Sequence, residues 1–446
     1  MHNQVKITRG LDIQLKGRAA HVLEQAPRAP MYAVKPTEFY GINPRLKVKI
    51  GDHVNAGDEL FYHKYIDKIK FSSPVSGTIE DIIRGEKRKI LKILIKPDAT
   101  DTFKKFEVKH PSDLSREQIL DLLLQSGLFA MVKQRPYDVI AHPDDNPKAI
   151  FISAFDSAPL GVDYAFALKS KMQDFKTGIS ALKKLTGGKV YLIVNGNTAS
   201  DFDKIEDVEI IKAFGPHPVG NVSVSIEKFE PIAKGDRIWT VNPADVAIMG
   251  NFFNTGEYHV ERHVALAGSE IKEPKYYKMT AGADLSDFLK DKLKEENVRL
   301  ISGNVLTGSN ITKDKFLNFY DNEISAIPPG NKPRFMGWLP FLGKNRKGFY
   351  NFGWETSKEL DIDANLYGEE RAFVMTEEFE AVMPLDIYPV HLLKAALLGD
   401  VEKMEQLGIL EVAPEDFALL DYINSSKIDT QELIRKGLDI MQVEIG

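Results

Sequence analysis

Apolar and polar residues alternate with a period of two between residues 36 and 96. This alternation predicts half-buried strands, because successive side chains of a strand point to opposite faces. Gly51, Gly57, Gly77 and Gly85 fall between the runs, where a chain that reverses direction needs a positive φ. The pattern therefore predicts a small flattened barrel of short strands.

Two continuous apolar runs, residues 149–154 and 189–194, predict strands that are buried on both faces. Between them, apolar residues recur at helical spacing over residues 163–185, and Gly187 and Gly188 end the run. Buried strands joined by a helix of this length predict a parallel sheet with crossover helices, Rossmann-like in outline.

A further helix is expected within residues 112–133. Ser112–Asp113 or Ser115 would cap it, and it would stop at Gly127. Residues 1–35 carry the alternating pattern of a first strand followed by a linker.

The second half of the chain shows two more patterns. Residues 258–310 follow a strand–strand–helix–strand order, with the helix over residues 284–293, which fits a β-grasp unit. Residues 376–443 are helical in pattern, with breaks at 399–400, 408 and 425–426. Between them, residues 326–353 are rich in Pro, Gly and aromatics, which predicts a long exposed loop suited to a contact surface.

These patterns predict a multidomain α/β protein with six parts. The expected parts are an N-terminal strand and linker (1–35), a biotinyl/lipoyl-like barrel (36–105), a Rossmann-like domain (106–257), a β-grasp domain (258–325), a loop region rich in Pro, Gly and aromatics (326–375) and a helical domain (376–446).

Composition narrows the function classes. Apolar residues make up 43% and charged residues 27% of the 446 residues, which is typical of a globular chain with real cores. The net charge of -6, with both signs well mixed, argues against a nucleic-acid binder. No signal peptide is evident and the apolar runs are too short to span a bilayer, so we expect a cytoplasmic chain that is soluble when isolated.

The chain contains no cysteine. Disulfides, thiolate nucleophiles, cysteine zinc sites and ordinary iron–sulfur ligation are therefore excluded. We also find no Walker A, GxSxG or histidine–carboxylate metal spacing, and thus predict no metal site and no catalytic residue.

His217 lies between two prolines, which fix the backbone on both sides of it. Such a histidine suits a ligand contact or a proton donor, although a rigid turn is the commoner role.

The barrel pattern resembles the biotinyl/lipoyl domain, in which a lysine at a hairpin tip carries the cofactor. Lys68 is the candidate, but the Met-Lys-Met tip of that family is missing and the spacing to the following Ser73-Pro74 phrase is short. We therefore expect a barrel used as a scaffold, with a biotin or lipoyl carrier as the lesser alternative.

The whole chain resembles the A subunits of sodium-translocating NADH:quinone oxidoreductases. It is more distantly similar to the C subunit of the Rnf complex and to the flavin subunit of respiratory complex I. The resemblance rests on residues 6–15, 51–60, 73–79, 85–88, 215–218 and 261–268.

The relatives that bind FMN carry a glycine-rich loop after the first helix. Here residues 127–136 occupy that place with the single glycine Gly127, so side chains would keep the backbone amides from a phosphate.

The Rnf subunit carries two C-x2-C-x2-C-x3-C-P runs for 4Fe–4S clusters. Residues that cannot ligate iron stand at both sets of positions here, which suggests that side chains fill the cluster volumes. The positions are Phe373, Thr376, Phe379 and Met383, and then Pro414, Phe417, Leu420 and Asn424.

The resemblance implies a peripheral subunit on the cytoplasmic face of the bacterial inner membrane. Its complex would pass electrons from NADH to quinone and export sodium. The implied partners are the membrane subunits B, D and E and the flavin subunits C and F, with flavins and iron–sulfur clusters expected in the partners only.

We expect this subunit to contribute to quinone binding without an NADH site of its own. A quinone needs an apolar slot and one or two donors at its carbonyls. The expected contacts are Tyr40, Gly41, Asn43, Phe129, Met131, Lys133, Arg135 and His217. The alternative is a structural cap that is needed for assembly and binds no ligand.

Overall fold

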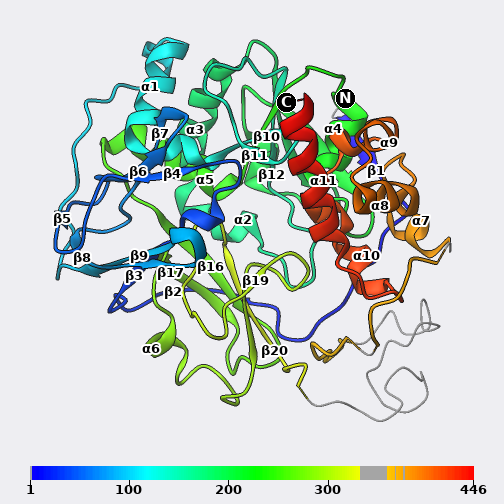
Figure 1. Ribbon diagram of the computed structural model, residues 1–446. Coiled ribbons are helices and arrows are strands. Elements are labelled where there is room, and N and C mark those ends of the chain that lie inside the picture. Colours follow the sequence, from blue (N-terminus) through cyan, green and yellow to red (C-terminus); the bar gives the residue numbers. More distant parts are fainter. Residues whose placement is uncertain (1–2, 332–358, 367, 375–376, 446) are drawn as a thin grey trace.

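The computed structural model describes residues 3–331, 359–366, 368–374 and 377–445. Within these ranges the chain forms two large sheets, a small barrel and a group of C-terminal helices (Figure 1). Most of the predicted loop over residues 326–353 lies outside the described residues. None of the helices described has both the length and the apolar content needed to cross a bilayer.

The first large sheet has seven strands in the order β1-β14-β13-β12-β15-β10-β11. The first five in this order run parallel, whereas β10 is antiparallel to both β15 and β11. The two buried runs of the sequence are β12 and β13, and their parallel pairing confirms the prediction. The strands are β1 (Asn3–Lys6), β10 (Val132–Arg135), β11 (Val139–Ile140), β12 (Ala149–Ser153), β13 (Lys189–Asn195), β14 (Glu209–Phe214) and β15 (Ile238–Val241).

Helices cover both faces of this sheet (Figure 1). Ile150 and Ile152 of β12 face one core together with α1, α3 and α5, whereas Ala149 and Phe151 face a second core shared with α4 and the C-terminal helices. This division follows the two-residue period of a strand, and it explains why the run is apolar throughout. The helices are α1 (Arg116–Ser126), α2 (Tyr164–Ala167), α3 (Met172–Leu185), α4 (Val222–Phe229) and α5 (Pro243–Thr255).

The predicted caps of α1 are confirmed, and the predicted helix 163–185 is interrupted. The Ser115 hydroxyl accepts from the Gln118 amide at 3.3 Å, and Gly127 ends α1 at a φ of 84°. The second helix divides into α2 and α3, because Leu168 and Lys171 leave the helical conformation at φ values of -100° and -106°. The Lys171 ammonium donates to the Glu261 carbonyl at 2.8 Å. Helical spacing does not encode that tertiary contact.

Residues 32–97 form the predicted barrel from two small sheets, ordered β3-β9-β8-β5 and β4-β6-β7. Phe61 and Phe71 stack in its centre with ring centroids 4.5 Å apart, and Phe39 packs against both. The strands are β3 (Tyr32–Val34), β4 (Pro44–Leu46), β5 (His53–Val54), β6 (Glu59–His63), β7 (Ile66–Ser72), β8 (Gly77–Arg84) and β9 (Ile90–Pro97).

The barrel glycines serve two different purposes. Gly51 and Gly57 have φ values of 89° and 92°, as predicted for reversals. The prediction is wrong for Gly85, whose φ is -98°, and for Gly77, which lacks a positive φ. At Gly77 a side chain is excluded instead because its Cβ would overlap the carbonyl oxygen of Lys96 on the neighbouring strand.

Lys68 lies within β7, whereas the turn between β6 and β7 is formed by Lys64 and Tyr65. Its side chain is 64% exposed, and its ammonium lies 3.8 Å from a carboxylate oxygen of Asp144. The position at the hairpin tip that a carrier lysine occupies is therefore not that of Lys68.

The second large sheet has six strands in the order β19-β18-β20-β16-β17-β2. Its strand β2 comes from the N-terminal segment and pairs in parallel with β17, so the first 25 residues contribute a strand to each large sheet. The predicted helix 284–293 shortens to the single turn α6 (Ser286–Leu289). The strands are β2 (Ala20–Gln25), β16 (Glu261–Ala267), β17 (Lys275–Thr280), β18 (Arg299–Ser302), β19 (Ser309–Asn310) and β20 (Glu323–Ile327).

The C-terminal helical unit packs on the first large sheet, and its predicted breaks are confirmed. Gly399 and Gly408 end helical segments at φ values of 66° and 86°. The side chains at four of the cysteine-spaced positions, Phe379, Met383, Phe417 and Leu420, are buried in one core, whereas Thr376 lies outside the described residues. The helices are α7 (Glu378–Val382), α8 (Pro389–Leu398), α9 (Val401–Gln406), α10 (Ala418–Ile423) and α11 (Thr430–Ile445).

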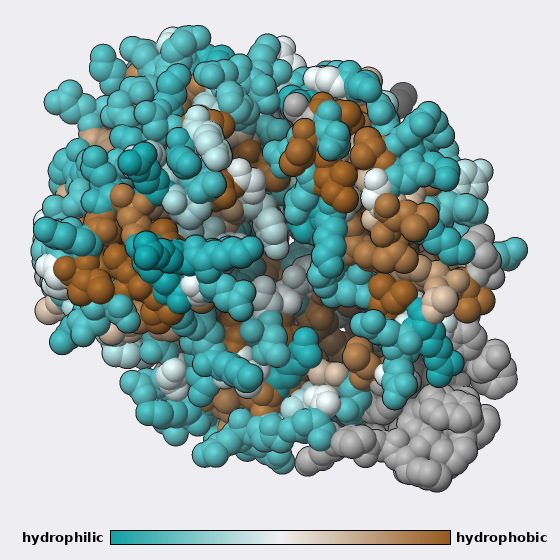
Figure 2. Space-filling model, in the orientation of Figure 1, coloured by the Kyte–Doolittle hydropathy of each residue, from teal (hydrophilic) through white to brown (hydrophobic). Residues whose placement is uncertain are grey.

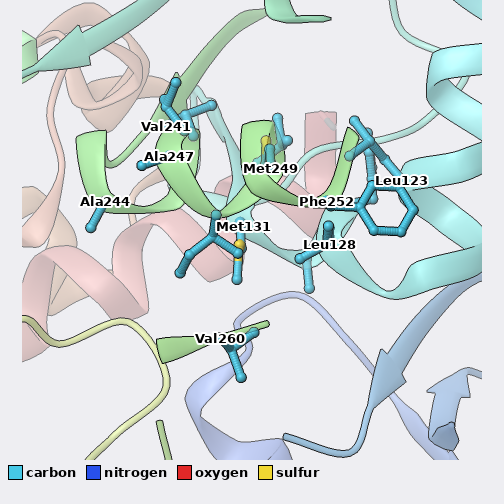
Figure 3. Close-up of a cluster of buried hydrophobic side chains, with 14 of the residues drawn as sticks. Leu123, Leu128, Met131, Val241, Ala244, Ala247, Met249, Phe252 and Val260 are labelled. Carbon is cyan, nitrogen blue, oxygen red and sulfur yellow. The ribbon is translucent and has the colours of Figure 1, made fainter. Parts of the chain in front are cut away.

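The segment that follows α1 belongs to the core between α1 and α5. Figure 3 shows Leu128 and Met131 beside α5, in the same buried cluster as Met249 and Phe252. Phe129 packs edge-on against Trp239 with ring centroids 5.7 Å apart. This segment therefore fills the interior, and its side chains close the space that a glycine-rich loop would leave open.

His217 is buried in the turn between β14 and α4. Its Nδ1 lies 3.0 Å from the Ser157 hydroxyl, and that hydroxyl accepts from the Gly220 amide at 2.9 Å. Its Nε2 is buried without a hydrogen-bond partner among the described residues. Burial lowers the pKa of His217 from 6.5 to about 4, so the ring is neutral at pH 7.

Two helices cross closely through glycines. A Cβ at Gly250 of α5 would overlap the Asp174 carbonyl oxygen of α3, and a Cβ at Gly178 of α3 would overlap the Val246 carbonyl oxygen of α5. We predict that Gly250→Ala lowers the free energy of unfolding by about 1–3 kcal/mol, because the two helices must move apart to admit the methyl group. Gly187→Ala is the control, since nothing lies within 4 Å of its Cβ position. Equal denaturation midpoints for both variants would contradict this packing.

The buried neutral His217 predicts a pH dependence of stability. The unfolded chain binds a proton at this histidine below pH 6.5 and the folded chain only below about 4, so stability falls as the pH drops through this window. The expected loss is about 3 kcal/mol. His217→Asn keeps an acceptor for Ser157 and removes the titration. Urea unfolding of this variant should show a flatter pH dependence than the parent, and parallel curves would refute the assignment.

Candidate functional site

A cavity of about 320 Å³ lies where the barrel, the β10–β11 hairpin and α11 meet; we call it the hairpin cavity. In the view of Figure 2 the surface is hollowed on the barrel side of α11. Ligand sites commonly form at such junctions between structural units. The lining residues are Gly41, Ile42, His63, Ile66 and Ile69 from the barrel side, Gln134, Tyr137, Val139, Ile140, Ala141, His142, Asp145 and Arg237 from the α/β side, and Gln442 from α11.

The turn of the β10–β11 hairpin forms one wall and has an unusual backbone. Tyr137 and Asp138 adopt φ values of 82° and 50°, which side chains other than glycine rarely do. Arg435 of α11 donates to the carbonyl oxygens of both residues, at 2.7 and 3.3 Å. Its guanidinium also lies 5.3 Å from the ring centroid of Tyr40. One side chain thus fixes the turn and the Tyr40 loop together.

Arg135, the last residue of β10, is buried and engaged in protein contacts. It donates to Glu415 at 2.8 Å and to the Ser223 hydroxyl at 3.3 Å, and lies 3.6 Å from a carboxylate oxygen of Asp138. Burial raises the pKa of Glu415, and the guanidinium opposes that effect. Arg135 therefore joins the hairpin to the C-terminal helical unit and does not reach the cavity.

Lys133 also lies away from the cavity. Its ammonium sits 4.8 Å from the ring centroid of Tyr320, whose hydroxyl donates to the Ala130 carbonyl at 2.6 Å. Because side chains alternate along β10, Gln134 takes the opposite face from Lys133 and Arg135. Gln134, which the sequence reasoning passed over, is the strand residue that lines the cavity.

The eight expected contacts therefore divide into two groups. Gly41 lines the cavity, Tyr40 lies beside it under Arg435, and the Asn43 amide donates to His63, which lines it. The other five do not line it: Phe129 and Met131 are core residues, Lys133 and Arg135 face other groups, and His217 lies in its own turn.

Sequence reasoning missed the polar groups that do line the cavity. His63 ends β6 in the barrel and His142 follows β11, and Arg237 lies 3.6 Å from Asp145 in an ion pair. Because these residues are far apart in the sequence and share no motif spacing, only the fold brings them together.

A second concavity of about 550 Å³ is an exposed groove that includes Lys68, Lys70, Lys104 and Lys105. Lys70 pairs with Glu59 at 3.6 Å, and Lys105 pairs with Glu257. Since these charges are solvated or already paired, the groove offers a ligand less than the hairpin cavity does.

The residues present fit neither a flavin cradle nor a metal. The stretch after Gly127 forms a buried turn inside the core, and its amides do not face an open site. Among the described residues, no group of three or more His, Asp or Glu could hold a metal ion.

Three family models match this chain. They are described as the NqrA N-terminal barrel-sandwich hybrid domain (residues 5–98), the NqrA second alpha/beta domain (residues 114–258) and the NQRA C-terminal domain (residues 263–313). The barrel is thus confirmed as a barrel-sandwich domain within a multidomain α/β protein.

Curated relatives match over the full length. The A subunit of the Na(+)-translocating NADH-quinone reductase of Hahella chejuensis is 34% identical, over 99% of this chain and 100% of the relative. The protein of the same name from Haemophilus influenzae is 33% identical and that from Saccharophagus degradans 31%, each with the same coverage.

Among solved structures, an NAD+-reducing NiFe hydrogenase aligns with a TM-score of 0.39 and 12% identity, over 75% of this chain and 62% of that one. A likeness this weak carries no argument. The full-length relatives and the three domain models establish the family. The chain belongs to the family of Na(+)-translocating NADH-quinone reductase A subunits.

Proposed function

We propose that this subunit binds quinone in the hairpin cavity as part of a sodium-translocating NADH:quinone reductase. The observation that carries the proposal is the meeting of two distant stretches at one cavity. The loop of residues 40–44, which the sequence predicts as a quinone contact, supplies Gly41 and Ile42, and the β10–β11 hairpin supplies the facing wall. Of the second predicted stretch, residues 129–135, only Gln134 lines the cavity.

The lining suits a flat ring with two carbonyl oxygens. Ile42, Ile66 and Val139 supply apolar walls, while Gln134 and Arg237 carry donors. The cavity volume of about 320 Å³ is at the lower end of small-molecule sites, which hold roughly 300–1,000 Å³. A quinone head group would therefore fill it, and the isoprenoid tail would leave through the open side.

In this proposal the redox chemistry belongs to the partner subunits. The chain has no cysteine and no glycine-rich phosphate loop, so we assign NADH oxidation and the flavin and iron–sulfur carriers to the neighbours. The expected partners are the membrane subunits B, D and E and the flavin subunits C and F, with this subunit peripheral on the cytoplasmic face.

We further propose that the seven-stranded sheet is a Rossmann-like domain and the six-stranded sheet a β-grasp domain. The parallel strands β12 to β15 with helices on both faces support the first assignment. The β16–β17 hairpin, followed by α6 and β18, supports the second.

A structural cap is the second candidate, and a surface feature favours it. Leu398 at the end of α8 is 78% exposed and Val443 on α11 is 84% exposed. Figure 2 shows apolar surface over these two helices. Exposed apolar patches mark protein contacts, so this face suits a partner protein whether or not quinone binds.

The proposal predicts that filling the cavity abolishes quinone binding. Ile42→Trp should weaken the binding of a short-chain benzoquinone at least about tenfold, because the indole takes the volume of the ring. Ile50→Trp places the same side chain on the barrel at a position that is 58% exposed and outside the cavity. Titration of the intact protein with both variants is the test. Absence of saturable binding in the parent would favour the cap instead.

The Arg435 clamp predicts a second outcome. Arg435→Met leaves the positive-φ turn without its two hydrogen bonds, so the hairpin should open more often, with a local cost of about 1–3 kcal/mol. Hydrogen exchange of residues 132–141 should accelerate, and quinone affinity should fall. Lys436→Met on the same helix removes only an exposed ion pair with Glu432 and serves as the control. Identical exchange in the two variants would refute the clamp.

A further inference from the structure

Two histidines from different parts of the fold line the hairpin cavity with the same local geometry. His63 ends β6 in the barrel, and His142 follows the hairpin strand β11. In each ring one nitrogen is held by the backbone. The Asn43 amide donates to His63 Nδ1 at 3.2 Å, and the Asp144 amide donates to His142 Nδ1 at 3.3 Å.

These contacts determine where each ring carries its proton. A nitrogen that accepts a hydrogen bond has no proton, so a neutral imidazole held at Nδ1 is protonated at Nε2. Burial lowers the pKa of His63, and the nearby His142 lowers it further. Both rings therefore present an Nε2–H.

Neither Nε2–H is used within the described part of the chain. No hydrogen bond or ion pair there involves His63 Nε2 or His142 Nε2, and neither atom is sealed inside the core. The open space that both rings share is the hairpin cavity. Two donors that have no partner among the described residues thus belong to side chains that line one cavity.

Two other polar side chains that line the cavity have an acceptor that is already engaged. The Gln134 carbonyl oxygen already accepts from the His142 amide at 2.9 Å, which leaves its NH2 group as the free end. The Asp145 carboxylate is paired with Arg237. His63, His142 and Gln134 thus offer donors to a ligand that carries acceptors.

We propose that His63 and His142 bind the ligand by donating their Nε2–H groups to its carbonyl oxygens. This rests on the proposed function. A quinone has two carbonyl oxygens that accept hydrogen bonds, one for each imidazole. The two imidazoles are positioning groups for the carbonyls.

The test uses two substitutions that separate the ring nitrogens. His63→Asn and His142→Asn keep an acceptor near the position of Nδ1 and remove the Nε2–H. His63→Gln and His142→Gln keep an N–H near the position of Nε2. Each Asn variant of the intact protein should bind a short-chain benzoquinone about three- to tenfold more weakly at an unchanged melting temperature, and each Gln variant should retain most of the affinity.

Two outcomes overturn the inference in different ways. If the Asn variants bind quinone like the parent while Ile42→Trp abolishes binding, the site is right and the histidines are not its donors. If Ile42→Trp also changes nothing, the proposed quinone site fails and the inference fails with it. Nitrogen-15 shifts of the ligand-free protein give an independent readout, since a proton on Nδ1 of either ring would refute the geometry without any quinone.

Discussion

A buried guanidinium connects the β10–β11 hairpin to the elements that pack against it. Arg135 is 3% exposed and links the end of β10 to Glu415 of the C-terminal helical unit and to Ser223 of α4. Removing one partner of a buried ion pair typically costs about 3–5 kcal/mol, because the other charge stays buried and unpaired. The contact thus joins the hairpin, which forms one wall of the hairpin cavity, to the C-terminal helical unit.

The same junction connects the C-terminal helical unit to the cavity that we propose as the binding site. Arg435 reaches the turn from α11, and Gln442 of the same helix lines the cavity. The barrel supplies the opposite wall through Ile42 and His63. A partner that moved α11 would thus change the shape of the cavity from outside, since the helix forms part of the cavity wall.

Buried apolar side chains occupy four of the positions that the resemblance compares with cluster ligands. Phe379, Met383, Phe417 and Leu420 stand at the spacing of cluster ligands and pack together as an apolar core. Side chains that replace a buried cofactor must fill its volume, because cavities destabilise a fold. The stretch after Gly127 is filled in the same way, with Met131 buried in the core beside α5 (Figure 3).

The sequence by itself determined the barrel, the parallel strands β12 and β13, the caps of α1 and the breaks at Gly399 and Gly408. These features follow from local periodicity and turn chemistry, which neighbouring residues carry in full. Only the tertiary structure decided which side chains line the cavity. Lys133 and Gln134 are adjacent in sequence and face opposite sides of β10, and the register of that strand is set by β15 and β11. His63 and His142 share a cavity because two separate sheets meet there, and no local pattern records such a meeting.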